Sequence, residues 1–271
     1  MATLEECADR LDQLIDACGV RTLEFRSSIG TGKQHLAAAA LLATVLEMAY
    51  DFVLFFRRRG SISPKVILRS LMEAYVDTLN IARDADYLNY LYVAQLERDS
   101  LAYRRSKEPQ AADNRYFGEF LTHGVENEAR AADIERERQE LKAKGYDLLT
   151  IRQRFERAGE LDRYASVYYL LCGDSHHGLK ALERRHLFFE EDGRPGIRLF
   201  KPEGLATLLI EADTVAGIVA IAVAEVSRLL DGDVVEMDRV GQTLETFRRA
   251  MRELLAAAPE EAEEVEEPMT S

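Results

Sequence analysis

The chain has 271 residues, 47% of them hydrophobic, with six prolines and sixteen glycines, which allows a sizeable core and long helices. Its net charge of −13 argues against a general nucleic-acid-binding surface, so RNA binding has no support from charge. Residues 259–271 hold six glutamates, and removing them from −13 leaves −7 on the body. Three cysteines without a CxxC pair and a charged N-terminal segment predict a reducing, cytoplasmic environment.

Two helices are predicted at the N-terminal end. Thr3 is a suitable N-cap and Gly19 a suitable stop, which predicts a first helix over about 3–18. The next helix, about 34–59, is apolar nearly all round, so we expect it at the centre of the fold.

Two apolar stretches, 36–56 and 214–226, raise the question of a membrane span. Glu47 and Asp51 interrupt the first, and the second is shorter than a bilayer requires, so both are predicted to be core helices without membrane contact. Glu47 and Asp51 share one helix face. If they are buried they need a cationic partner, and Arg69 on the following helix is a natural one.

The third predicted helix, about 63–84, opens with Ser-Pro and carries Arg69, Glu73 and Asp77 at spacings of four. Three interpretations of this polar stripe stay open. It is the solvated face of an amphipathic helix, a buried ion-pair network with the preceding helix, or the wall of a functional pocket.

A fourth helix is predicted over about 86–106 and a long, heavily charged one over 114–145. The charged part, 126–144, is the best candidate for contact with a protein partner or for self-association. Short helical turns are expected over 150–157.

The next predicted helix, about 160–185, contains His176 and His177 with glycines on either side. Tyr169 precedes His176 by about two turns, which places both on one side of the helix. The (D/E)xxH spacing of ferritin-like di-iron bundles occurs twice here, but such bundles take that motif from two different helices. We therefore predict neither a metal site nor a cofactor. A mononuclear metal site with Glu73, Asp77 and His176 stays open as an alternative.

The C-terminal part predicts a β-hairpin over about 186–202 around the turn DGRPG, then helices over 203–230 and 236–257. The whole is expected to be an all-α fold: a multi-helix bundle of long helices with that one small hairpin, in a single domain over 1–258. The acidic segment 259–271 is expected to be disordered.

Two segments, ILRSLMEAYVDTL and YYLLCGDSHHG, resemble an uncharacterised bacterial all-α family with an RSxxE helix and a later helix carrying Tyr and His. Arg69, Ser70 and Glu73 match the first motif. In the second, Cys172 stands where serine is more usual, and His176 is the matching histidine. Such families are loosely grouped with HEPN-like helical bundles, many of which are ribonucleases of defence systems.

This resemblance implies a HEPN-like nuclease or a ligand-binding component of a bacterial defence or stress module. The usual HEPN signature places an arginine four to six residues before a histidine, and none of the five histidines has one there. Arg69 and His176 on separate helices could supply the same groups, a cation for phosphate and a base near neutral pH. The competing hypothesis is a non-catalytic interaction protein. The candidate catalytic residues are Arg69, Glu73 and His176, and the candidate binding residues are Glu47, Asp51, Asp77, Tyr169 and His177.

Overall fold

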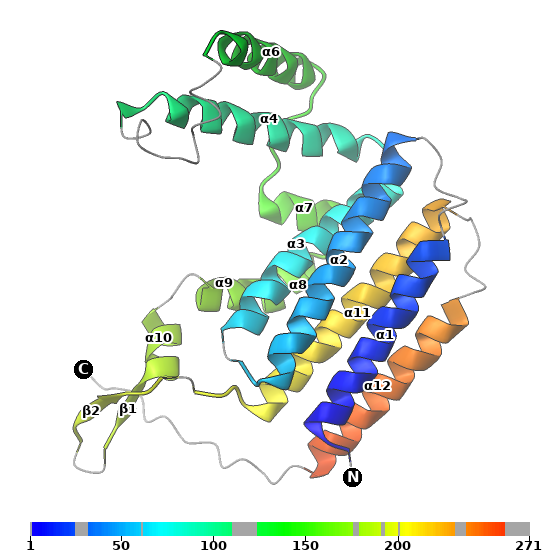
Figure 1. Ribbon diagram of the computed structural model, residues 1–271, viewed down its shortest axis with the longest axis vertical. Coiled ribbons are helices and arrows are strands. Elements are labelled where there is room, and N and C mark those ends of the chain that lie inside the picture. Colours follow the sequence, from blue (N-terminus) through cyan, green and yellow to red (C-terminus); the bar gives the residue numbers. More distant parts are fainter. Residues whose placement is uncertain are drawn as a thin grey trace.

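The computed structural model describes residues 2–24, 32–60, 62–109, 124–175, 179–190, 193–199, 201–230 and 237–257. Helices form nearly all of this structure, and the described strands make one short antiparallel pair (Figure 1). The predicted fold class, an all-α bundle with one small hairpin, is confirmed. The acidic segment 259–271 lies outside the described residues.

Five long helices lie side by side and form the main bundle (Figure 1). They are α1 (Leu4–Glu24), α2 (Lys33–Arg57), α3 (Ser63–Arg83), α11 (Leu205–Leu230) and α12 (Asp238–Ala257). Helix α11 packs against the other four, and small buried residues such as Ala212, Ala216 and Ala222 allow close approach of its backbone. The prediction that 214–226 lies in the core is therefore confirmed.

Helix α1 runs through Gly19 to Glu24, so the predicted stop at Gly19 is wrong. A glycine inside a helix costs about 1 kcal/mol relative to alanine. Burial of Leu14 and Cys18 in the bundle core outweighs that cost. Nothing lies within 4 Å of a Cβ placed at Gly19, so packing does not require a glycine there.

Helix α2 is less central than its composition predicts. Its inner side is buried in the core through residues such as Leu42 and Phe52, but Leu36, Tyr50 and Leu54 are exposed. Both α2 and α11 are long and apolar enough to cross a membrane by length and composition, a property they share with core helices of soluble proteins. The expectation of a fully central α2 is wrong because, among the described helices, none covers the face that carries Leu36, Tyr50 and Leu54.

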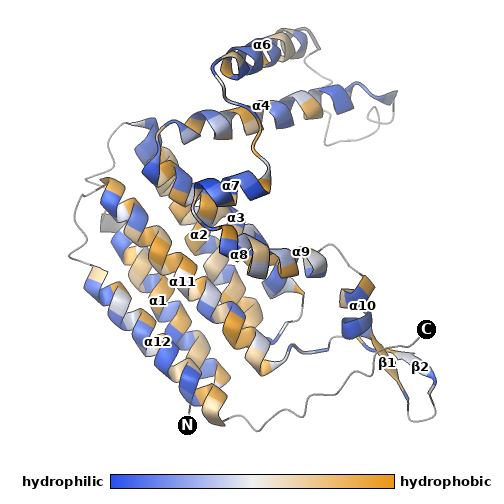
Figure 2. Ribbon diagram, turned by 180° about the vertical axis from the view of Figure 1, so that it is seen from behind, coloured by the Kyte–Doolittle hydropathy of each residue, from blue (hydrophilic) through white to orange (hydrophobic). Residues whose placement is uncertain are grey.

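Two helices form an arm across one end of the bundle. Helix α4 (Tyr87–Ser106) crosses near the end of α3, and α6 (Gly124–Ala143) lies along α4 (Figures 1 and 2). Arg138 of α6 and Glu97 of α4 form an ion pair of 2.5 Å between them. The predicted helix over 114–145 is described only from Gly124, because 114–123 lies outside the described residues.

The predicted continuous helix over 160–185 is wrong. The chain instead forms α8 (Leu161–Arg163), a π-helical turn η4 (Tyr164–Tyr168), α9 (Tyr169–Ser175) and a separate α10 (Leu179–His186). Helix α10 runs in a different direction from α9 (Figure 1). A π-turn widens the helix locally, and periodicity in a sequence does not reveal it.

The predicted hairpin is confirmed. Strands β1 (Leu187–Phe189) and β2 (Pro195–Ile197) pair antiparallel. The intervening turn uses Gly193 with φ 81°, a conformation that favours glycine. The Phe188 ring lies over Gly196 on the opposite strand, where a Cβ would collide with it.

Candidate functional site

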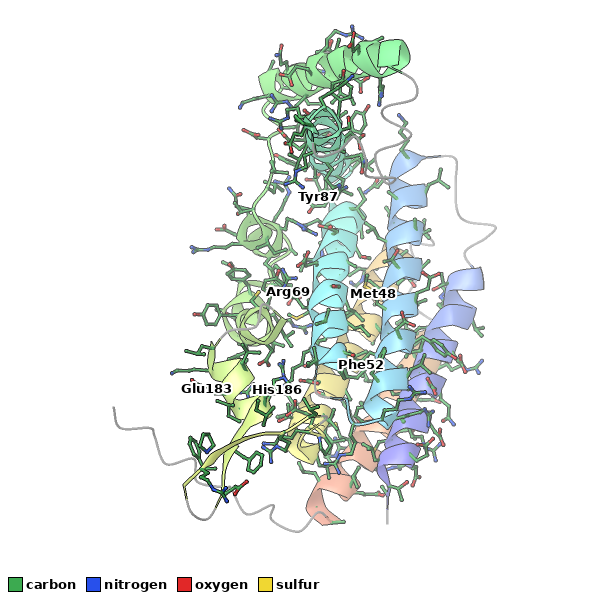
Figure 3. The ribbon with its side chains drawn as sticks, turned by 60° about the vertical axis from the view of Figure 1, so that its left-hand side comes forward. Met48, Phe52, Arg69, Tyr87, Glu183 and His186 are labelled. Atoms are coloured by element: carbon green, nitrogen blue, oxygen red, sulfur yellow. The ribbon has the colours of Figure 1, made fainter. Side chains whose placement is uncertain are left out.

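Arg69, Glu73 and Asp77 lie in a line along α3. Later segments of the chain pack against α3 on the side where Arg69 lies (Figure 3). The Arg69 Nη2 donates a hydrogen bond of 3.1 Å to the Tyr168 hydroxyl, which donates one of 2.7 Å to Glu73 Oε1. Arg69 and Glu73 are also 3.2 Å apart as an ion pair. Burial raises the pKa of Tyr168, and its bond to Glu73 raises it further, so the phenol remains a neutral donor.

Asp77 is 8% exposed and is held by a guanidinium from α7 (Ile151–Arg157). Arg154 Nε donates to Asp77 Oδ1 at 2.8 Å, and its Nη2 donates to Oδ2. The Tyr87 hydroxyl donates to the same Oδ1 at 2.6 Å. Burial alone would lower the pKa of Arg154, but the charge and hydrogen bonds of Asp77, together with the smaller contributions of Tyr87 and Glu73, outweigh it and the pKa is raised. Arg69, Glu73, Asp77, Arg154 and Tyr168 together are called the Asp77 cluster below.

A cavity of about 810 Å³ opens beside this cluster, between α3, α4 and α7. Glu73, Asp77 and Arg154 line its inner wall. Helix α4 supplies the facing wall, including Arg98 and Arg104. Of the candidate site residues named from the sequence that the structure describes, only Glu73 and Asp77 line this cavity, and Arg69 does not.

Glu47 and Asp51 do not belong to this site. Both are exposed on α2, and within the described part of the chain neither forms an ion pair or a side-chain hydrogen bond. The expectation that they are buried and paired with Arg69 is wrong. Arg69 instead turns to the opposite neighbour of α3, where Tyr168 lies.

The structure also differs from the sequence prediction at Tyr169. This residue is 71% exposed, whereas the preceding Tyr168 is 2% exposed and makes the contacts with α3. Adjacent residues on a helix point about 100° apart, so an error of one position moves a side chain from the site to solvent. The π-helical turn that ends at Tyr168 sets this orientation.

His176 and His177 lie outside the described residues, between the end of α9 at Ser175 and the start of α10 at Leu179. Cys172, four residues before His176, is described. Burial alone would lower the pKa of Arg69. Hydrogen bonding to Cys172, the next largest influence, and the contributions of Tyr168 and Glu73 together raise it. Among the described residues, no three His, Cys, Asp or Glu side chains are grouped to hold a metal ion.

A second charged cluster, which the sequence analysis missed, surrounds Lys65 near the start of α3. Lys65 is 5% exposed, and its Nζ lies 3.3 Å from Asp174 and 2.6 Å from Glu203. Arg185 of α10, 6% exposed, reaches Asp174 from the other side at 3.8 Å. These residues and Glu211 of α11 are called the Lys65 cluster.

Glu211 is the unusual member of the Lys65 cluster. It is 7% exposed, and its Oε2 has no hydrogen-bond partner among the described residues. Burial raises its pKa from 4.5 to about 7; the Lys65 charge opposes this rise, while Glu203 and Asp174 add to it. This carboxyl group therefore changes protonation near neutral pH.

Sequence spacing could not have linked these partners. Arg154 is 77 residues from Asp77 and lies on a helix of seven residues. The only local signal is the capping box of Thr150 and Gln153, which fixes where that helix begins. The Lys65 cluster combines residues from α3, α9, α10 and α11 with the segment that precedes α11, so no single periodic stripe contains it.

The fold and site define a helical protein with a charged cluster beside a cavity between helices. Residues 35–194 match the family of unknown function DUF5677, and the chain belongs to this family. This agrees with the all-α family of unknown function expected from the sequence. The matched residues run from α2 into the hairpin and include the whole Asp77 cluster. No curated protein and no solved structure matches the chain.

Proposed function

We propose that this protein binds a small anionic ligand in the cavity between α3, α4 and α7. The observation that carries the proposal is the charge of the cavity wall. Each carboxylate in its lining is paired with an arginine. Glu73 is paired with Arg69, Asp77 with Arg154 and Glu97 with Arg138. Within the described residues Arg98 and Arg104, which also line the cavity, form no ion pair.

The rest of the lining suits a ligand with an apolar body. Leu41, Leu91, Leu101 and Leu149 contribute apolar surface, and the Tyr87 and Tyr90 side chains lie beside them. The volume of about 810 Å³ falls within the roughly 300–1,000 Å³ typical of small-molecule sites. An anionic group bound by two arginines with an apolar body against the leucines fits this wall.

The fluorescent probe anilinonaphthalene sulfonate, which combines an anionic group with aromatic rings, tests this proposal. We expect saturable binding that weakens about tenfold in the double variant Arg98→Gln/Arg104→Gln, the loss of roughly 1.4 kcal/mol. The matched control is Arg239→Gln/Arg249→Gln, which removes two exposed arginines from α12. Equal binding by both double variants would contradict the proposal.

A second candidate is phosphodiester cleavage in a HEPN-like bacterial defence or stress component, centred on Arg69, Glu73 and His176. The hydrogen bonding of Arg69 favours this candidate. Its side chain is 26% exposed, and its Nε has no hydrogen-bond partner among the described residues. Arg69 would bind a phosphate, Glu73 would orient Arg69, and His176 would take the proton of an attacking hydroxyl.

Incubation with single-stranded RNA in the presence of EDTA tests this second candidate. Arg69→Gln and His176→Ala are expected to lower cleavage about 100-fold, the usual scale for losing one acid–base or electrostatic group. Arg152→Gln, an exposed change on α7, serves as the control. Intact RNA with the unaltered protein would instead favour a non-catalytic interaction role, for which the charged and largely exposed α6 offers a surface.

A further inference from the structure

No segment in the described part of the chain covers the mostly apolar outer face of α2. Leu36, Tyr50 and Leu54 are 53%, 52% and 45% exposed, and Ala40 and Ala43 between them are exposed too. These positions recur at helical spacing and form one stripe along the helix. Only 33% of the most apolar part of α2 is buried, compared with 56% for α11.

We propose that two copies of this chain associate through the outer face of α2, with the two helices antiparallel. A helix that is apolar nearly all round is normally buried. Contact with an apolar surface would therefore remove this stripe from water. A lipid bilayer does not suit this face, because Glu47 and Asp51 lie along it and charged groups are costly inside a bilayer.

Charge complementarity singles out a second copy. Lys33 and Asp51 lie nine residues before and after Leu42, on the same edge of the stripe. A two-fold axis that crosses the pair of helices at the level of Leu42 therefore places Lys33 of one copy opposite Asp51 of the partner subunit. This charge pair occurs twice per dimer. Within the described part of a single chain, neither Lys33 nor Asp51 forms an ion pair.

Shape and spacing agree with this arrangement. The small residues Ala40 and Ala43 lie beside the proposed axis, where the two backbones would come closest, and the larger Leu36, Tyr50 and Leu54 lie further out. Glu47 of each copy would be roughly 15 Å from its symmetry mate along the axis, beyond the range of strong repulsion.

The stripe predicts a modest interface. A helix of 25 residues is about 37 Å long, and one pair of such helices buries less than the roughly 800 Å² per partner of a standard stable interface. The dimer is therefore expected to exchange with monomer, so its fraction rises with protein concentration.

Sedimentation velocity of the full chain over a range of concentrations tests the proposal. The unaltered protein should shift from monomer to dimer as its concentration rises. Ala43→Arg, which puts a long charged side chain at the crossing point, should remain monomeric with an unchanged circular dichroism spectrum. Ile210→Arg, a change of a 66% exposed residue on α11, should dimerise like the unaltered protein.

Charge reversal provides a sharper test. Lys33→Glu alone and Asp51→Lys alone each place like charges together and should weaken the dimer about tenfold. An equimolar mixture of these two variants should restore it, because each mixed dimer regains opposite charges at both ends of the interface. An unaltered protein that stays monomeric would overturn the proposal, as would a mixture no better than its components. The proposal would also be overturned if the protein stayed monomeric and bound phosphatidylglycerol vesicles, and if Ala43→Arg changed that binding. The outer face of α2 would then be a lipid-binding surface.

Discussion

The two charged clusters along α3 differ in how much water reaches them. In the Asp77 cluster, the side chains of Arg69 and Glu73 are 26% and 30% exposed. In the Lys65 cluster, the side chains of Lys65 and Asp174 are only 6% and 12% exposed. The first cluster borders the cavity, whereas the second holds α9, α10 and α11 around one end of α3.

This difference in exposure leads us to expect different roles for the two clusters. Removing one partner of an enclosed ion pair leaves an uncompensated charge, which costs far more than losing the same pair at a surface. The Lys65 cluster is therefore expected to govern stability. The Asp77 cluster, which water can reach, keeps groups available to a ligand at a smaller cost in stability.

The largest expected effect follows from Lys65→Met. This change leaves Asp174, Glu203 and Glu211 without their shared cation, and we expect the free energy of unfolding to fall by about 3–5 kcal/mol. Arg69→Met in the Asp77 cluster should lower the free energy of unfolding by only about 1 kcal/mol, because water screens the charges that remain.

Urea denaturation measures both changes, with Lys142→Met, whose side chain is 65% exposed, as the control. That control should stay within about 0.5 kcal/mol of the unaltered protein. Similar losses for Lys65→Met and Arg69→Met would remove the distinction between the two clusters.

The next effect concerns pH. The pKa of Glu211 is raised from 4.5 to about 7 on folding, so the folded state binds this proton more tightly than the unfolded state does. Its contribution to stability is complete below about pH 4.5 and is lost as pH rises through about 7. A shift of this size corresponds to about 3 kcal/mol.

Glu211→Gln tests this dependence by removing the titrating group at nearly constant shape. Subtracting the unfolding free energy of the variant from that of the unaltered protein should give a difference that declines as pH rises from 4.5 to 8. A matched change at an exposed residue of α12, Glu245→Gln, should give no such decline over the same pH range. A difference that grows with pH would mean that Glu211 is stabilised as a carboxylate.

Hydrophobic spacing and local capping signals predicted the long helices, because spacing reports which side of a helix meets the core. They placed α3, α4, α11 and α12 within a few residues of their observed bounds. They failed where tertiary packing decides the outcome. Gly19 lies inside α1 because the bundle stabilises that helix beyond its local stop signal.

The same limit applies to the candidate site. The line of Arg69, Glu73 and Asp77 was visible because one helix carries all three. Arg154 was not visible, because only the folded chain brings α7 against α3. Glu47 and Asp51 were misjudged because an apolar helix was assumed to be covered on every side, whereas α2 has an open face.

The smallest effect compares two neighbouring tyrosines. Tyr168→Phe removes the hydroxyl that joins Arg69 to Glu73, and we expect a loss of about 1 kcal/mol, since this hydrogen bond is only partly shielded from water. Tyr169→Phe removes a hydroxyl from a side chain that is 71% exposed, so its cost should stay within about 0.5 kcal/mol. Urea denaturation of the two variants side by side is the measurement. The reverse order would mean that Tyr169 and not Tyr168 faces α3, and Arg69 and Glu73 would then lose their link through η4.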